Sequence, residues 1–137
     1  MVCLGNICRS PLAEGILRDK VSSENVLVDS SGTASYHIGS PPDERSIAVA
    51  KKYGLDISNL KGRQFSVRDF DVFDYIYVMD NYNYTEVTKQ ARNQEDISKV
   101  KLILNEIYPN QNFNVPDPYQ SGQQAFEDVF MMLDEAC

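Results

Sequence analysis

The chain has 137 residues, 42% of them hydrophobic, which is enough to bury a single core in one compact domain. Its formal net charge of −7 argues against a general nucleic-acid binder, because affinity for DNA or RNA depends on lysine and arginine side chains that neutralise phosphates. If the ligand is a phosphate, the positive potential must be local, made by backbone N–H groups and one or two arginines.

The cysteine count and the hydropathy pattern bear on location. Three cysteines are an odd number, and the first of them lies too near the start of the chain to leave space for a secretory signal segment. No apolar stretch approaches the roughly 18 residues that a membrane crossing needs. We therefore expect a reduced, cytoplasmic protein that does not associate with a membrane.

The first part of the chain predicts a strand, a loop and a helix. Residues 1–4 are typical of the end of a buried strand, and residues 5–9 form a loop that contains a glycine. Ser10 and Pro11 are a favourable N-cap and first-turn pair, which predicts a helix that starts where this loop ends. The loop would then lie against a helix N-terminus.

The middle of the chain repeats this alternation. Residues 26–28 are a short apolar run that predicts a second strand, and residues 43–53 have helical spacing with Gly54 as the stop. Residues 75–79 are nearly all apolar, as expected of a strand that is covered on both faces, and residues 100–104 are a second run of this kind.

The end of the chain is predicted to be helical, because apolar residues between 125 and 133 recur at a spacing that gives one wide apolar face. The alternation of strands and helices predicts a single α/β domain over residues 1–137, with a parallel sheet covered by helices on both faces. Ligands bind beyond the carboxyl ends of the strands in such sheets. The loop that follows Cys3 lies at such an end and is the first candidate for a binding site.

Cys3 and Arg9 stand at the two ends of this loop, and the residues between them favour an anion site. Gly5 and Asn6 are the residues most able to take left-handed backbone conformations, which lets successive N–H groups point inward. These donors and the helix dipole would hold phosphate oxygens and would favour the thiolate form of Cys3. Arg9 can offer a planar fork to two phosphate oxygens, and Ser10 can donate its hydroxyl to the sulfur. The alternative is a buried packing cysteine and a surface arginine without a catalytic role.

The segment Val2–Pro11 resembles the signature loop of the low-molecular-weight protein tyrosine phosphatases. The resemblance continues along the chain. Residues 29–33 with Tyr36 resemble the family's second loop, residues 73–80 its third strand, and residues 116–119 its general-acid loop. Because these motifs also occur in the family's order, the chain is similar to this family over its whole length.

The resemblance implies a four-stranded parallel sheet in the order 2-1-3-4, with the phosphate-binding loop after strand 1. It implies that Cys3 attacks phosphorus, that Asp117 protonates the leaving tyrosine oxygen, and that Asp117 then acts as base toward the water that hydrolyses the phosphocysteine. This chemistry needs no metal and no cofactor. The phosphoryl oxygens would be bound by the loop and its arginine, that is, by Leu4, Gly5, Asn6, Ile7, Cys8, Arg9 and Ser10.

The same resemblance gives supporting roles to further residues. Asn6 and Ser30 would brace the loop through side-chain hydrogen bonds. Tyr36 and Tyr119 would form aromatic walls for the substrate ring. Cys8 would capture the oxidised nucleophile as a disulfide.

Several of these residues also have a simpler interpretation. Asp117 lies between two prolines and could be a turn residue, since Pro-Asp-Pro is ordinary loop chemistry. Tyr36 and Tyr119 could be half-buried aromatics with hydroxyl groups in water. Cys8 could be a packing residue. His37 is the only histidine and is expected in a loop near the entrance of the site.

The chain departs from the family pattern at two places. Gln120 follows Tyr119 where many relatives carry a second aromatic residue, which thins the wall of the acid loop. Only Met1 and Val2 precede Cys3, so we expect a first strand that is truncated at its N-terminus.

Three other functions remain as alternatives. A thioredoxin-coupled arsenate reductase needs two further cysteines in a relay, and Cys8 with Cys137 does not have that arrangement. Arginine phosphatases of this type look to carry a threonine where this chain has Ile7. A phosphotyrosine-binding module without turnover would not need both Cys3 and Asp117. We therefore predict a monomeric phosphatase of phosphotyrosine-containing proteins and small aryl phosphates, whose site also takes inorganic phosphate or other oxyanions.

Overall fold

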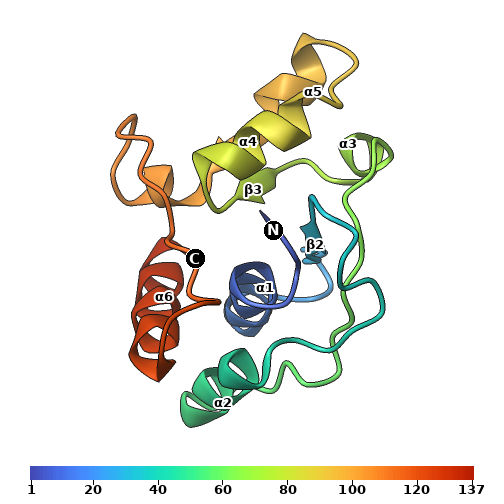
Figure 1. The fold of residues 1–137 in the computed structure, drawn as a ribbon. Helices are drawn as coiled ribbons and strands as arrows, with labels where there is room; N and C mark the ends of the chain where they lie inside the picture. Colours follow the sequence, from blue (N-terminus) through green and yellow to red (C-terminus); the bar gives the residue numbers. More distant parts are fainter.

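The computed structural model describes residues 1–137 and contains one four-stranded sheet (Figure 1). The strands are β1 (Val2–Cys3), β2 (Ser31–Gly32), β3 (Ile76–Val78) and β4 (Val100–Leu102), in the order β2-β1-β3-β4. All three strand pairings are parallel. The predicted fold class, number of strands and strand order are confirmed.

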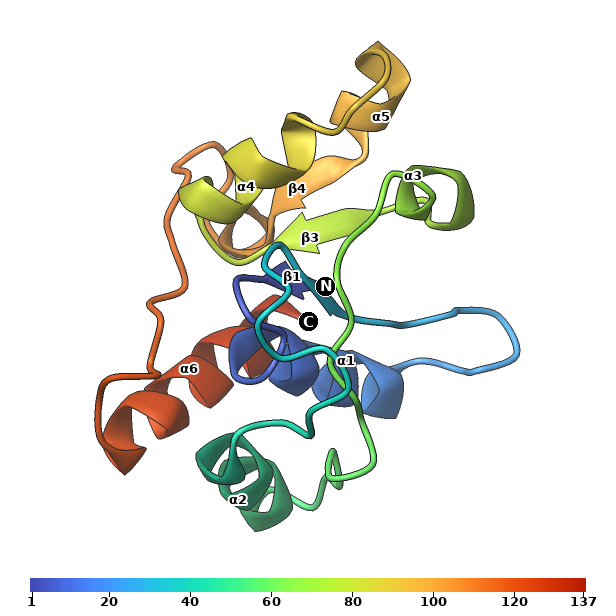
Figure 2. The ribbon, with the colours of Figure 1, turned by 45° about the vertical axis from the view of Figure 1, so that its right-hand side comes forward.

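Helices cover both faces of the sheet (Figures 1 and 2). The helices are α1 (Arg9–Lys20), α2 (Glu44–Lys52), α3 (Asp69–Val72), α4 (Asn81–Thr88), α5 (Gln94–Ser98), the 3-10 helix η1 (Ile103–Glu106) and α6 (Gln123–Ala136). Helices α1, α2 and α6 pack against one another on one face, and α3, α4 and α5 lie on the other. None of these helices has the length and apolar character that a membrane crossing requires.

The sheet divides the core into two apolar clusters, because successive strand residues point to opposite faces. Val2 belongs to the cluster under α3 and α4, together with Phe70 and Val87. Cys3 belongs to the cluster under α1, α2 and α6, which includes Leu12 and Phe126. Cys3, the second residue of β1, therefore lies on the face of the sheet against which α1 packs.

The strand predicted at residues 26–28 is wrong in position, because β2 lies at Ser31–Gly32. Val26 and Leu27 are exposed, and only Val28 is buried. The ladder forms where a partner strand lies opposite, and the two residues of β1 pair with Ser31–Gly32. Local apolar character did not decide the position of the strand.

The predicted N-cap role of Ser10 is also wrong. Helix α1 begins at Arg9, Cys8 occupies the N-cap, and no side chain caps the helix. The Ser10 hydroxyl instead lies 3.0 Å from Cys3 Sγ and receives the Asn6 amide. The helix start is thus determined by the loop before it.

The predicted helices at residues 43–53 and 125–133 are confirmed as α2 and α6. Asp43 caps α2 by accepting the backbone N–H of Arg45 at 2.9 Å. Gly54 takes a φ of +82° directly after this helix, a conformation that favours glycine. The predicted strand at residues 100–104 ends at Leu102 and continues as η1.

Candidate active site

The segment from Cys3 to Arg9, here called the phosphate loop, joins β1 to α1. Four of its carbonyl oxygens accept hydrogen bonds of 2.8 to 3.2 Å from segments that surround it. The pairs are Cys3 with the Thr33 N–H, Leu4 with the Ala34 N–H, Ile7 with the Asp43 N–H, and Cys8 with the Ser46 hydroxyl. The carbonyl groups are therefore held on the outside of the loop.

The backbone N–H groups of the same loop are free for another acceptor. Five of them have no acceptor in the protein, those of Leu4, Gly5, Ile7, Cys8 and Arg9. The Asn6 N–H donates to Cys3 Sγ at 3.3 Å. A ring of unpaired N–H groups at the start of a helix is an anion site, because the donors and the helix dipole both favour negative charge.

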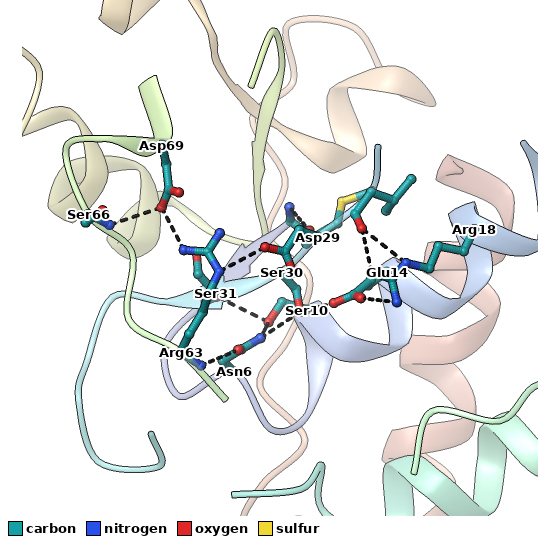
Figure 3. Close-up of polar contacts among 12 residues, drawn as sticks. Asn6, Ser10, Glu14, Arg18, Asp29, Ser30, Ser31, Arg63, Ser66 and Asp69 are labelled. Carbon is teal, nitrogen blue, oxygen red and sulfur yellow. Dashed lines mark hydrogen bonds and ion pairs between the residues drawn. The ribbon is translucent and has the colours of Figure 1, made fainter. Parts of the chain in front are cut away.

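The side chain of Asn6 keeps this loop in shape (Figure 3). Asn6 has a φ of +57°, which is left-handed, and its buried amide donates to Ser10 Oγ at 2.8 Å and to Ser30 Oγ at 2.9 Å. Its Oδ1 accepts the backbone N–H of Arg63 at 3.0 Å. These bonds offset the cost of the left-handed conformation, which asparagine tolerates better than most residues.

Strand β2 passes very close to the phosphate loop at Gly32. A Cβ atom at this position would lie 2.7 Å from the Leu4 carbonyl oxygen and 3.0 Å from the Asn6 nitrogen. Only glycine allows this approach, and Ser30, two residues before Gly32, lies in reach of the Asn6 amide.

The Cys3 thiol is buried at the base of the loop and lies 3.0 Å from Ser10 Oγ. Ser10 receives the Asn6 amide, so its own proton is available for the sulfur or for the Ser31 carbonyl oxygen at 3.3 Å. With the Asn6 N–H at 3.3 Å, two donors are directed at the sulfur. Hydrogen bonds of this kind are stronger to a charged acceptor than to a neutral one.

Arg9 is only 2% exposed, and one carboxylate and one carbonyl group hold one side of its guanidinium. Its Nη1 donates to Asp80 Oδ2 at 2.6 Å and to the Val115 carbonyl oxygen at 2.9 Å. Its Nη2 lies 3.7 Å from Asp117 Oδ2. One side of the guanidinium is therefore anchored, while the other side faces the segment that carries Asp117.

Residues 115–120, here called the acid loop, reach the phosphate loop from the end of the sheet. The Val115 N–H donates at 2.8 Å to the carbonyl oxygen of Met79, the residue that directly follows β3. The Asp117 side chain is 45% exposed, and its Oδ1 accepts only the Tyr119 N–H, at 3.1 Å. Asp117 therefore stands in a proline-flanked turn with one oxygen toward Arg9 and access to water.

Arg45 of α2 holds the far end of the acid loop. Its guanidinium donates to the carbonyl oxygens of Tyr119 and Ser121, both at 2.8 Å, and pairs with Asp43 at 3.0 Å. It also lies 4.4 Å above the centroid of the Phe126 ring. The acid loop is thus attached to a helix that packs on the same face as α1.

A cavity of about 230 Å³ lies between the two loops. Its lining residues are Cys3, Leu4, Gly5, Ile7, Cys8, Arg9, Tyr36, His37, Asp117 and Tyr119. Tyr36 is 77% exposed and Tyr119 is 47% exposed, so both stand at the mouth. A larger, mostly apolar cavity of about 380 Å³ is lined by Met1 and residues 25–29, among others, and includes neither Cys3 nor Arg9.

The two cysteines of the phosphate loop differ in their surroundings. Burial, followed by the negative charge of Asp43, raises the pKa of the Cys8 thiol to about 12. Cys8 is therefore a neutral thiol at physiological pH, whereas Cys3 has two donors directed at its sulfur. Cys137 directly follows α6 and contacts the carbonyl oxygen of Ala13, away from the cavity.

The structure brings the residues selected from the sequence to one place. Cys3, Arg9, Asp117, Tyr36 and Tyr119 line the cavity. The expectation that His37 stands near the entrance is met by its position among them. The other selected residues of the loop that line it are Leu4, Gly5, Ile7 and Cys8. The side chains of Asn6, Ser10 and Ser30 lie behind the loop and brace it.

Three contacts of the site were not found from the sequence. These are the ion pair of Arg9 with Asp80, the bond of the Arg63 backbone to Asn6, and the attachment of the acid loop by Arg45. Each joins residues far apart in the chain and leaves no local pattern. No three His, Cys, Asp or Glu side chains gather as metal ligands.

Comparison with known proteins adds a family to this geometry. A family model described as low molecular weight phosphotyrosine protein phosphatase matches residues 1–137. The human low molecular weight phosphotyrosine protein phosphatase is 39% identical over 141 residues, covering 99% of this chain and 88% of the human protein.

Solved structures agree in fold. Vibrio vulnificus Wzb, in complex with benzylphosphonate, has a TM-score of 0.88 at 33% identity and covers 98% of this chain and 90% of its own. An arginine phosphatase from drosophila has a TM-score of 0.88 at 35% identity, covering 99% and 90%. The fold is thus shared by proteins named for two phosphorylated side chains.

Proposed function

The chain belongs to the low molecular weight phosphotyrosine protein phosphatase family, and from this premise we propose that it hydrolyses protein phosphotyrosine through a phosphocysteine formed on Cys3. The observation that carries the assignment of residues is the cavity in which free N–H groups surround Cys3, with Arg9 and Asp117 beside it. An anion held there presents its central atom to the sulfur.

In the first step, the Cys3 thiolate attacks phosphorus and the bond to the tyrosine oxygen breaks. The loop N–H groups and the Arg9 fork bind the three phosphoryl oxygens, whose charge they stabilise in the transition state. Asp117 donates its proton to the leaving tyrosine oxygen, so that the product is a neutral phenol.

In the second step, Asp117 is ionised and accepts a proton from water as the water attacks the phosphocysteine. The phosphorus–sulfur bond breaks and inorganic phosphate leaves. The sulfur departs as a thiolate, which the Ser10 hydroxyl at 3.0 Å stabilises by donating to it. The cycle returns Cys3 and Asp117 to their initial states without a cofactor.

The mouth of the cavity suits an aromatic phosphate ester. Tyr36 and Tyr119 offer ring faces on which a phenyl ring can stack, and Ile7 offers an apolar floor. A thiolate nucleophile works in reduced form, and this requirement fits the expected cytoplasmic location.

Phosphoarginine is the second candidate substrate, because an arginine phosphatase from drosophila shares the fold. Ile7 opposes this assignment. Its side chain has no hydroxyl group that could orient a water molecule near a guanidinium, whereas an apolar side chain favours a phenyl ring. Phosphotyrosine is therefore the preferred substrate, and the two compounds should be compared directly.

Hydrolysis of phosphotyrosine, phosphoarginine and a small aryl phosphate by wild type and by Cys3→Ser tests the proposal. We expect phosphotyrosine to be turned over fastest and the Cys3→Ser variant to be inactive on all three. Cys137→Ser is the matched control, because Cys137 lies outside the cavity and should keep full activity. Turnover by Cys3→Ser would exclude Cys3 as the nucleophile. Faster turnover of phosphoarginine than of phosphotyrosine would show that phosphoarginine is the preferred substrate.

Cys8 gives the site a redox response in this proposal. Peroxide oxidises the Cys3 thiolate to a sulfenic acid, and the Cys8 sulfur then displaces water to form a disulfide. The raised pKa of Cys8, about 12, makes this capture slow at neutral pH and faster as pH rises. Mass spectrometry after brief peroxide treatment should find a Cys3–Cys8 disulfide that thiols reduce. A sulfinic Cys3 beside a free Cys8 thiol would identify Cys8 as a packing residue.

A further inference from the structure

A buried carboxylate lies behind the phosphate loop (Figure 3). Glu14 belongs to α1, is 2% exposed, and is not among the residues that line the cavity at Cys3. Its Oε1 accepts the Ser30 hydroxyl at 2.5 Å, and its Oε2 pairs with Arg18 at 2.6 Å. Burying a carboxylate is costly, so its presence next to the loop calls for a reason.

The groups between Glu14 and Cys3 can be linked by hydrogen bonds that all run in one direction. An ionised carboxylate only accepts, so the Ser30 hydroxyl donates to Glu14 and its oxygen accepts the Asn6 amide at 2.9 Å. The other proton of that amide goes to Ser10 Oγ at 2.8 Å. Ser10 therefore keeps its own proton, for which the Cys3 sulfur at 3.0 Å is the nearer acceptor and the Ser31 carbonyl oxygen at 3.3 Å the other.

The other end of the Asn6 amide is fixed by a group that can only donate. Asn6 Oδ1 accepts the backbone N–H of Arg63 at 3.0 Å. Arg63 is itself held, because its guanidinium pairs with Asp29 and Asp69, both at 3.0 Å. Because Glu14 only accepts at one end of this series of hydrogen bonds and the Arg63 N–H only donates at the other, the Asn6 amide can take only one orientation.

We propose that Glu14 is a positioning residue for the nucleophile: by accepting the Ser30 proton it fixes the direction of the hydrogen bonds through which the Ser10 hydroxyl donates to Cys3. This inference rests on the proposed role of Cys3. Loss of the carboxylate leaves Ser30 able to reverse and to compete with the Asn6 amide proton that it now accepts. The Arg63 N–H then holds the amide alone, and the Ser10 proton is directed at the sulfur less firmly. The thiolate is stabilised less, both before attack and as the leaving group of the second step.

The charges around Glu14 separate this role from a purely structural one. Burial raises the pKa of Glu14 above its ordinary value of 4.5, and Asp29 adds to the rise. The Ser30 hydrogen bond, the Arg18 charge and the Met1 amino group oppose it. The protonated form therefore stabilises the fold at pH values below 4.5, and this contribution is lost as pH rises through the raised pKa. In its ionised form Glu14 works against stability, a pattern more typical of functional groups.

The Glu14→Gln variant tests the inference, because glutamine has the same shape but can accept or donate. At about pH 7 we expect kcat for phosphotyrosine and the rate of Cys3 alkylation by iodoacetamide to fall roughly 2- to 10-fold, the effect of one hydrogen bond. The ratio of wild-type to variant rates should approach one as pH falls and Glu14 takes up a proton. The thermal unfolding midpoint should stay the same or rise.

Ser30→Ala and the double variant Glu14→Gln/Ser30→Ala complete the test. If Glu14 acts through Ser30, the double variant should be no slower than Ser30→Ala alone. Glu127→Gln on α6 is the matched control, since Glu127 pairs with Lys52 outside the cavity and its loss should not change the rate. Additive losses, a rate ratio independent of pH, or a lower unfolding midpoint that accounts for the lost activity would overturn the inference. Activity in Cys3→Ser would instead refute the proposed function.

Discussion

In the phosphate loop and the residue after it, Asn6, Arg9 and Ser10 are buried, and each side chain takes part in at least two hydrogen bonds within the fold. In the acid loop, Asp117 is 45% exposed and Tyr119 stands at the mouth of the cavity. The first region holds a charge that must not move during two chemical steps. The second must deliver a proton, take one from water and admit a protein substrate. The burial of the phosphate loop suits the charge that it holds in place. The exposure of the acid loop suits proton transfer and the entry of a protein substrate.

The largest effect is expected from Arg9→Lys. Lysine keeps the charge but cannot bridge two phosphoryl oxygens while donating to Asp80 and to the Val115 carbonyl oxygen. We expect kcat/KM to fall by about 10³-fold, and equally for phosphotyrosine and for an aryl phosphate with an electron-withdrawing ring. Steady-state kinetics on both substrates measures this. A near-normal rate would show that Arg9 does not bind the phosphoryl group.

Asp117→Asn should have a smaller effect that depends on the substrate. Proton donation matters for the basic tyrosine oxygen and little for an acidic leaving group, so phosphotyrosine hydrolysis should slow by about 10²-fold. Burst kinetics separates transfer to Cys3 from the second step, in which Asp117 acts as base. If the rate of the first step falls equally for both leaving groups, the proton for the leaving group must come from another carboxylate, Asp80 or Asp43.

Asp80→Asn tests how much the anchored side of the Arg9 guanidinium contributes to catalysis. Asparagine can still cap α4 by accepting the Asn83 N–H, but it removes the charge 2.6 Å from Arg9. We expect kcat to fall by about tenfold on both substrates, because Arg9 can then turn toward Asp117. A loss confined to phosphotyrosine would mean that Asp80 takes part in proton transfer.

The smallest effect is expected from Tyr119→Ala and Tyr36→Ala at the mouth. Each loses a ring face for stacking, so KM for phosphotyrosine should rise roughly 3- to 10-fold while kcat changes little. Tyr82→Ala is the matched control, because Tyr82 is an exposed tyrosine of α4 that does not line the cavity. An unchanged KM in both mouth variants would show that these rings do not contact the substrate.

Most of the fold and the centre of the site could be predicted from the sequence. The glycine and asparagine between Cys3 and Arg9 indicated the loop, and α2 and α6 followed from their apolar spacing and the Gly54 stop. These features depend on neighbours within a few residues, where backbone preferences and side-chain periodicity act directly. The assignment of Cys3 and Asp117 to one site came from the resemblance of two distant motifs to those of the phosphatase family.

The tertiary structure alone decided how these parts are fixed. It placed β2 at Ser31–Gly32, although the apolar run lies at residues 26–28, because a strand forms where its partner lies. It used Ser10 for the nucleophile instead of a helix cap. It also joined Glu14 and Arg63 to the same asparagine network from different segments. Such contacts depend on which distant groups the fold brings within about 3 Å, and no local pattern of residues records that distance.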